Sequence, residues 1–338
     1  MSLGRSFGET NPGRKRRRNE DAFVCEPPLF AVADGMGGAQ AGEIASSLAA
    51  AAVAGGLNGA DAPENAEQLV VELIQEANRR VHDRATNDAS ASGMGTTLTV
   101  ALARRDDVVA IGHVGDSRAY LLRDGALEQL TDDHSLVAEL VRRGELSPEE
   151  AEVHPQRSVI TRALGTDPDV DVDVFSIEGR AGDVFLLCSD GLSTMVDPDT
   201  IAETVQRHRP DLEAATRALI KAANDGGGED NITAVLFEIG GAAVDDEPTM
   251  EAAGAAVAVE PESDTFVREP AVTAGGREGD TVIVSADDLR AALAEGGRPP
   301  EAEPAQARVP FVRFVLATLV IVVLAGLIVV LAVWGLAR

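Results

Sequence analysis

The chain contains few aromatic residues, few cysteines and little positive charge. Aromatic residues make up only 3% of the 338 residues, so a core must be built mainly from Ala, Val, Leu and Ile. The only two cysteines, Cys25 and Cys188, lie in apolar, strand-like runs, which favours two buried thiols of a cytosolic protein over a disulfide. The 29 basic residues face 56 acidic ones and give a formal charge of −27, which excludes nucleic acid as a partner.

Composition divides the chain into three regions. Residues 1–240 alternate strand-like and helix-like segments, and we expect them to form one folded domain. Residues 241–310 carry 15 acidic residues against five arginines, which predicts a flexible linker. Within that linker, Asp280–Ala294 combines an apolar run with an amphipathic, helix-like stretch that fits either a docking motif or a transient helix. Residues 311–338 are almost wholly apolar and predict a membrane anchor.

The C-terminal region fits a transmembrane helix. Phe314–Ala337 contains 24 residues without a charge, and a helix of that length spans roughly 36 Å, enough for a tilted crossing of the bilayer. A buried helix of a globular protein would need a polar face, and this segment has none. Arg308 and Arg313 precede the span, Arg338 follows it, and the N-terminus shows no apolar export signal. We therefore expect a single-pass protein of the cytoplasmic membrane with its folded domain in the cytoplasm.

The pattern of the first 240 residues predicts an α+β domain of stacked layers. Apolar runs separated by short polar turns, as at Arg104–Asp107 and Arg123–Gly125, are typical of antiparallel hairpins rather than parallel crossovers. Helices then cover the sheets. The expected strands are Leu29–Ala33, Thr96–Arg104, Asp107–His113, Arg118–Leu122, Asp183–Ser189 and Thr233–Ile239, and the expected helices are Ala41–Ala54, Ala66–Ala85, Ser135–Arg143 and Asp211–Ala223.

Several aspartates lie where apolar strand-like runs meet glycine or turn-forming residues. A single Asp-Gly pair is weak evidence, and we interpret Asp124-Gly125 as a simple hairpin turn. Packed together, and next to Glu20-Asp21, four strand-end carboxylates would repel each other unless cations lay between them. Oxygen ligands of this kind suit Mg²⁺ or Mn²⁺ better than Zn²⁺. The four are Asp34, Asp116, Asp190 and Asp230.

Seven short motifs follow one another in residues 5–240. In sequence and order they are TNPGRKRRRNED (10–21), ADGMGG (33–38), GMGTT (93–97), VGDSR (114–118), TDDHS (131–135), SDGL (189–192) and EDNIT (229–233). Their order and spacing resemble the bacterial branch of the PPM family, the type 2C metal-dependent protein serine/threonine phosphatases. The resemblance implies a four-layer α-β-β-α sandwich, in which two packed antiparallel sheets are flanked by helices. It also implies a flap subdomain over Thr131–Gly165.

The resemblance implies a site for two Mn²⁺ or Mg²⁺ ions, with a third, weaker site. Asp34 would bridge the two ions, and the Gly35 carbonyl would bind the second of them. Asp190 and Asp230 would bind the first ion, and Asp116 would share the third with Asp190. Water bridging two such ions has a lowered pKa and can attack phosphorus as hydroxide, without a phosphoenzyme.

Arg16 and Asp34 are the expected catalytic residues. Arg16 falls at the family's phosphate-binding arginine, and its guanidinium can grip two phosphate oxygens. The alternative is that it belongs to a solvated basic run, Arg14–Arg18. Glu20 and Asp21 would order metal-bound waters.

Two positions depart from the family pattern. Asn11 stands where the family usually has Asp, and Met36 fills the place where eukaryotic relatives have His. Methionine cannot donate a proton, so the leaving group must be protonated by water or another group. For His113, His134 and His154, we expect structural roles rather than general acid catalysis.

The sequence thus predicts a monomeric catalytic domain that dephosphorylates phosphoserine and phosphothreonine in proteins and counteracts serine/threonine kinases at the membrane. The alternative is a catalytically silent, membrane-tethered phosphoprotein-binding regulator. Loss of ligand carboxylates would indicate that alternative, and all four are present.

Overall fold

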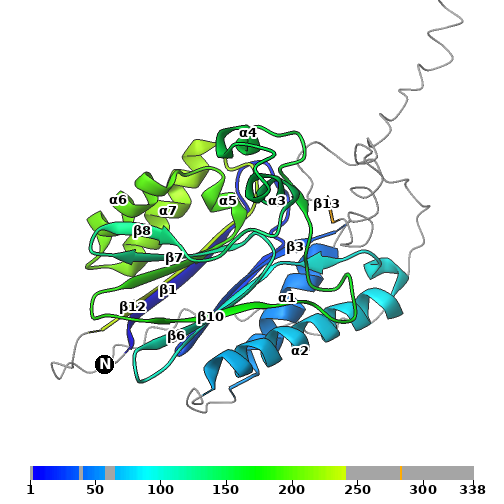
Figure 1. Ribbon diagram of the computed structural model, residues 1–338, viewed down its shortest axis with the longest axis horizontal. Helices are drawn as coiled ribbons and strands as arrows, with labels where there is room; N and C mark the ends of the chain where they lie inside the picture. Colours follow the sequence, from blue (N-terminus) through cyan, green and yellow to red (C-terminus); the bar gives the residue numbers. More distant parts are fainter. Residues whose placement is uncertain (1–2, 38–40, 58–64, 241–281, 284–338) are drawn as a thin grey trace, which may run out of the picture. The chain divides into compact units, whose positions relative to one another are not determined.

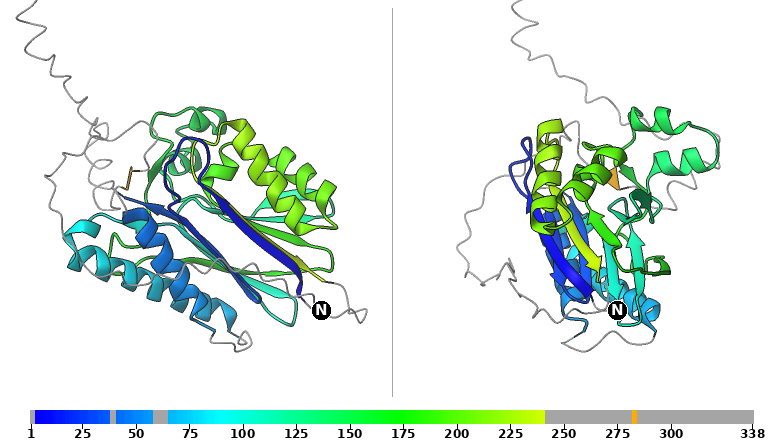
Figure 2. Two further views of the ribbon diagram at one scale, coloured as in Figure 1. Left: turned by 180° about the vertical axis from the view of Figure 1, so that it is seen from behind. Right: turned by 90° about the vertical axis from the view of Figure 1, so that its left-hand side faces the viewer.

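The computed structural model describes residues 3–37, 41–57, 65–240 and 282–283. Two antiparallel sheets face each other, and one pair of long helices covers the outer face of each (Figures 1 and 2). The predicted four-layer α-β-β-α sandwich is therefore confirmed for the domain. The predicted membrane span lies outside the described residues, and no helix among those described is long and apolar enough to cross a bilayer.

Each sheet mixes strands from distant parts of the sequence. The first has the order β1 (Leu3–Asn11), β12 (Ile232–Ile239), β11 (Val184–Cys188), β7 (Arg118–Arg123) and β8 (Ala126–Gln129). The second has the order β10 (Asp173–Glu178), β6 (Val108–Val114), β5 (Leu98–Ala103), β3 (Leu29–Met36) and β2 (Asp21–Glu26), and the short β4 (Gly95–Thr96) also pairs with β3.

The four long helices protect the outer faces. Helices α1 (Ala41–Ala54) and α2 (Ala66–Asn87) pack on the second sheet, whereas α6 (Pro198–His208) and α7 (Leu212–Gly226) pack on the first (Figure 2). The shorter elements are η1 (Ala89–Ala91), α3 (Leu136–Arg142), α4 (Pro148–Glu152), β9 (Val159–Ile160), α5 (Asp190–Ser193) and β13 (Val282–Ile283).

The apolar core has three layers, one between the sheets and one under each helix pair. Between the sheets, the ring of Phe237 stacks on Phe30 and Phe185, with centroid distances of 4.1 and 4.9 Å. Under α1 the contacts are mostly alanine, including the fully buried Ala45 and Ala49. Small side chains let that helix lie close to β3, so a chain poor in aromatic residues still fills its core.

Both expected hairpins are present. The Arg104–Asp107 turn joins β5 to β6, and Asp124-Gly125 joins β7 to β8 with φ angles of 51° and 92°. Such positive angles twist a two-residue turn to match its strands. Both cysteines are free.

Other expectations were incomplete. The predicted elements omit β1, β10 and α6, and Val282–Ile283, within the predicted apolar run, forms a parallel pair with β9. The remainder of Asp280–Ala294 lies outside the described residues.

Candidate active site

Five aspartates meet at one end of the sandwich. Asp21 opens β2 directly opposite Asp34 near the end of β3, while Asp190 follows β11, Asp230 precedes β12, and Asp116 lies in the turn between β6 and β7. Burial and the negative charges of the other four raise the pKa of Asp34 well above its usual range. The structure therefore brings together all four aspartates predicted as metal ligands. Asp21, which was predicted only to order metal-bound water, lies in the same cluster.

The carboxylates are unfavourable neighbours as bare anions. Burial, followed by the charge of Asp230, raises the pKa of Asp190 to about 6, although a hydrogen bond with Asp34 opposes the shift. Burial raises the pKa of Asp21 to about 7. Burial and the charge of Asp190 likewise raise the pKa of Asp116. Bound protons or cations would stabilise this arrangement.

The residues present fit a hard divalent cation. Two buried carboxylate oxygens, Asp21 Oδ1 and Asp190 Oδ1, accept no hydrogen bond from the residues that the structure describes, which is costly unless a ligand satisfies them. The backbone at Gly35 is also closely enclosed, since a Cβ there would lie 2.1 Å from Gly42 O and 2.5 Å from Glu20 O. Carboxylate and carbonyl oxygens are the ligands that Mg²⁺ and Mn²⁺ prefer.

The ligand geometry is not preformed. Among the described residues, no three His, Cys, Asp or Glu side chains are arranged around one point as metal ligands. Asp230 Oδ2 instead accepts a hydrogen bond from Arg16 Nη2 at 2.8 Å. Arginine thus balances part of the negative charge of these neighbouring carboxylates.

Arg16 lies in the site as predicted, bonded to a predicted metal ligand. Its side chain and that of Asp230 are both 27% exposed, so the pair is half-buried. The position of Arg16 rules out the alternative that it belongs to a merely solvated loop.

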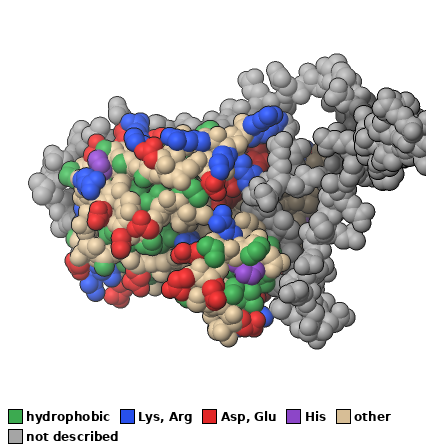
Figure 3. Space-filling view, turned by 90° about the horizontal axis from the view of Figure 1, so that it is seen from above, with side chains coloured by type: hydrophobic (Ala, Val, Ile, Leu, Met, Phe, Trp, Pro, Cys, Tyr) green, Lys and Arg blue, Asp and Glu red, His purple; other side chains and the backbone are tan. Residues whose placement is uncertain are grey.

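The basic run around Arg16 is neutralised by acidic partners. Most of its side chains pair with carboxylates from distant segments, and basic and acidic side chains are interspersed on the face in Figure 3. Salt bridges therefore tie this basic run to other segments of the domain. The pairs are Arg14 with Asp225, Lys15 with Glu229, Arg16 with Asp230 and Arg18 with Glu43.

Asp21 lies deeper in the site than expected. Its Oδ2 accepts hydrogen bonds from Ser189 Oγ at 2.8 Å and Thr233 Oγ1 at 2.5 Å. Glu20 contributes through its backbone, since its carbonyl accepts a hydrogen bond from Gly35 N at 3.1 Å. Asp21 thus belongs to the inner group of carboxylates.

Asn231 organises the site and was missed by the sequence analysis. Its Oδ1 accepts a hydrogen bond from Glu20 N at 2.8 Å, and its Nδ2 donates to Pro12 O and Arg18 O at 3.1 and 2.9 Å. The side chain thereby fixes both ends of the loop that carries Arg16. Its place in the EDNIT motif was the available signal, but a polar residue after Asp230 does not reveal contacts more than 200 positions away.

A histidine holds the Asp116 turn. His134 Nδ1 accepts a hydrogen bond from Gly115 N at 3.0 Å, so the neutral ring carries its proton on Nε2, which donates to Asp173 Oδ2 at 3.0 Å. The adjacent His113 is fully buried, and burial together with His134 lowers its pKa to about 3. Both contacts support the structural roles expected for these histidines.

The flap region borders the site. Met36 packs in a small buried cluster with Ile160 and Ala163, and Thr96 and Leu164 exchange two backbone hydrogen bonds, of 3.2 and 2.9 Å. Met36 therefore joins β3 to the flap.

A sandwich with partly buried aspartates gathered at its strand ends has the form of a metal-dependent enzyme, and comparison with known proteins identifies the family. The protein phosphatase 2C family matches residues 14–236. The chain is 43% identical to the serine/threonine phosphatase stp of Listeria welshimeri over 237 residues, which cover 68% of this chain and 93% of that protein. It is 40% identical to the serine/threonine protein phosphatase PstP of Mycobacterium tuberculosis over 235 residues, covering 70% of this chain and 45% of that protein.

Solved structures agree. The crystal structure of Mycobacterium tuberculosis PstP/Ppp is 40% identical, with a TM-score of 0.68, and covers 71% of this chain and 100% of that one. The catalytic domain of PstP in complex with two manganese ions is 37% identical, with a TM-score of 0.64, and covers 71% of this chain and 99% of that one. The chain belongs to the protein phosphatase 2C family, and the prediction of a protein serine/threonine phosphatase is confirmed.

Proposed function

We propose that the chain hydrolyses phosphoserine and phosphothreonine in proteins, using two Mn²⁺ or Mg²⁺ ions bound at the aspartate cluster. Asp34, Asp190 and Asp230 would hold the ions together with the Gly35 carbonyl. Asp116 and Asp190 would form a third, weaker site. The observation that carries this proposal is the pair of buried carboxylate oxygens on Asp21 and Asp190 without a hydrogen-bond donor.

The bound ions supply Lewis acidity that activates water and neutralises phosphate charge. The protein positions the other groups. Asp21, held by Ser189 and Thr233, keeps a second carboxylate beside Asp34. Arg16, which now binds Asp230, would exchange that carboxylate for a substrate phosphate, where a guanidinium stabilises the charge of the transition state.

The comparisons support the substrate class and the metal. Relatives 38–43% identical are named serine/threonine or protein phosphatases, and a PstP catalytic domain was solved with two manganese ions. None of the predicted ligands has been replaced in this chain, which favours an active enzyme over a silent binder.

Two matched variants test this function. Residues 1–240 are the appropriate protein, because they include the whole described site and because the Listeria relative is matched over 93% of its length. We expect Mn²⁺-dependent release of phosphate from a phosphothreonine peptide, lost in Asp34→Asn. Asp124→Asn changes the same residue type in another Asp-Gly pair, at the β7–β8 turn, and should retain full activity. Equal activity of both variants would contradict the proposal.

For the full chain, we propose that residues 311–338 anchor the phosphatase to the cytoplasmic membrane, where it counteracts kinases. The 24-residue uncharged segment supports this. Full-length protein should pellet with membranes and resist extraction by carbonate, whereas a chain ending at residue 310 should remain in the supernatant. Recovery of both proteins in the supernatant would exclude the anchor.

A further inference from the structure

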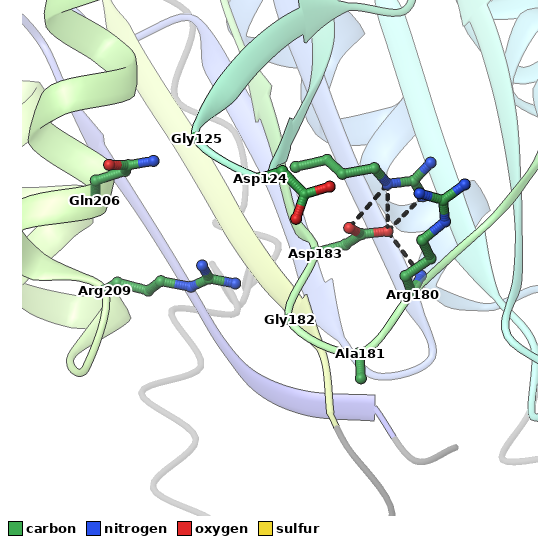
Figure 4. A pocket seen from close by; sticks show the side chains of 9 residues that line it. Asp124, Gly125, Arg180, Ala181, Gly182, Asp183, Gln206 and Arg209 are labelled. Atoms are coloured by element: carbon green, nitrogen blue, oxygen red, sulfur yellow. Dashed lines mark hydrogen bonds and ion pairs between the residues drawn. The ribbon is translucent and has the colours of Figure 1, made fainter.

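A second charged site lies at the opposite end of the sandwich from the aspartates. Strand β7 begins beside Asp116 and ends at Arg123, and β11 runs the other way, from Asp183 to Asp190. Six residues of strand separate the two ends by about 17 Å, at about 3.3 Å per residue. A pocket of about 610 Å³ opens at this far end (Figure 4). Its lining residues are Arg123, Asp124, Gly125, Arg180, Ala181, Gly182, Asp183, Gln206 and Arg209.

Among the described residues, two of the three pocket arginines have guanidinium groups without an acidic partner. Arg123 binds the buried carboxylate of Asp183, which also accepts a hydrogen bond from Arg180 N at 2.7 Å. The guanidinium groups of Arg180 and Arg209 form no ion pair or hydrogen bond within the residues that the structure describes. Arg209 reaches the turn at Gly182, where a Cβ would lie 3.1 Å from its Nη2.

The lining selects for charge. It contains no aromatic side chain and, apart from Ala181, no apolar one, so a nucleobase or an aliphatic ligand would find little to pack against. Its three arginines outnumber its two aspartates in a chain of net charge −27. An anion with several carboxylates is the complementary ligand.

The chain supplies such a group close by. Strand β12 leaves the sheet at this end, where Ile239 N donates to Asp183 O at 2.9 Å and Gly182 N donates to Ile239 O at 2.8 Å. The sequence continues GAAVDDEPTM, with three consecutive acids at Asp245, Asp246 and Glu247. Six to eight extended residues reach at most about 20 to 28 Å, so a connection of this length is short enough for these carboxylates to reach the pocket at high effective concentration.

We propose that the acidic segment Asp245–Glu247 docks in this pocket, on Arg180 and Arg209. Docking would hold the start of the linker against the end of the domain remote from the active site. Asp124 faces the same pocket and opposes binding in part, whereas Arg123 is engaged with Asp183.

A labelled peptide of residues 241–252 tests the proposal by fluorescence anisotropy. It should bind residues 1–240, and the double variant Arg180→Gln/Arg209→Gln should weaken binding at least tenfold. Both side chains lie at the surface, so the fold should persist and phosphatase activity should be unchanged. Arg207→Gln removes the same charge from α6, outside the pocket, and is the matched control.

The full chain identifies the occupant. If its own linker fills the pocket, the full-length protein in detergent should bind the peptide about tenfold more weakly than residues 1–240 do. Asp245→Asn/Asp246→Asn/Glu247→Gln in the full chain should restore binding. Equal binding by full-length and truncated proteins would show that the linker does not occupy the pocket and would overturn the proposal. No binding to residues 1–240, or binding unaffected by the arginine variants, would overturn it as well.

Discussion

The two ends of the sandwich treat charge in opposite ways. At the aspartate end, five carboxylates are crowded together, and two of their oxygens are buried without a donor. At the arginine end, Asp183 is more deeply buried but is surrounded by donors from Arg123 and the backbone of Arg180. The first end is strained until a cation binds, and the second is already satisfied. Without metal, a carboxylate should therefore destabilise the fold at the aspartate end and stabilise it at the arginine end.

Asp190→Asn should have the largest effect on activity. Losing a ligand carboxylate should lower Mn²⁺-dependent kcat by on the order of 10³-fold or more. The same change removes a charge from the crowded cluster, so without metal it should raise stability by about 1–2 kcal/mol. Peptide hydrolysis and thermal unfolding in EDTA measure the two effects. A variant that is both inactive and less stable in EDTA would mean that the aspartate end is not strained.

Asp183→Asn is the counterpart at the arginine end. The Asp183 side chain is 3% exposed and pairs with Arg123, so removing its charge should lower stability by about 3 kcal/mol. Activity of the folded fraction should persist, because the site lies at the other end. Asp124→Asn, at an exposed neighbouring position, is the control and should change stability by less than about 0.5 kcal/mol. Denaturant unfolding of the unchanged protein and the two variants measures this difference in stability. Similar midpoints for all three would contradict the contrast between the two ends.

The sequence predicted most of the sandwich because its core segments carry clear patterns. Helix α1 has the predicted bounds, Ala41–Ala54. Strand β1 was missed because it is half-buried over most of its length and its Gly8 lies under the ring of Phe23, so apolar and polar residues do not alternate. Helix α6 had an overlooked signal, since Asp197 caps it and Pro198 follows.

The site was predictable in its residues but not in its contacts. Each aspartate marks a strand end, and antiparallel strands bring such ends together. Arg16 meets Asp230 across 214 positions, and no local pattern encodes that pairing. The arginine pocket was not predicted either, because its three arginines come from separate places in the sequence: Arg123 ends β7, Arg180 follows β10, and Arg209 caps α6.

Raising the pH should weaken the metal-free domain. The folded pKa values of Asp190 and Asp21, about 6 and about 7, exceed the unfolded value of 3.8. Between pH 4 and 7, the unfolded chain therefore releases protons that the folded chain retains, and the contribution of these groups to stability falls as pH rises. The difference in melting temperature between Mn²⁺-loaded and EDTA-treated protein should widen by about 5 °C over this range. The EDTA-treated Asp190→Asn variant should lose less stability between pH 4 and 7 than the unchanged protein does. If its stability depended on pH in the same way, other groups would be responsible for the effect.

His134 should make the smallest difference, confined to the Asp116 turn. In His134→Ala, Gly115 N loses its acceptor, and the turn with its φ of 111° loses a restraint. We expect the Mn²⁺ concentration for half-maximal rate to rise about threefold to tenfold, the range for one lost hydrogen bond. His134→Asn places an amide oxygen where Nδ1 accepts the bond and should restore most of the affinity, although it loses Asp173. Because the turn carries a carboxylate of the proposed weaker metal site, a metal dependence identical in all three proteins would show that the aspartate end keeps its geometry without this support.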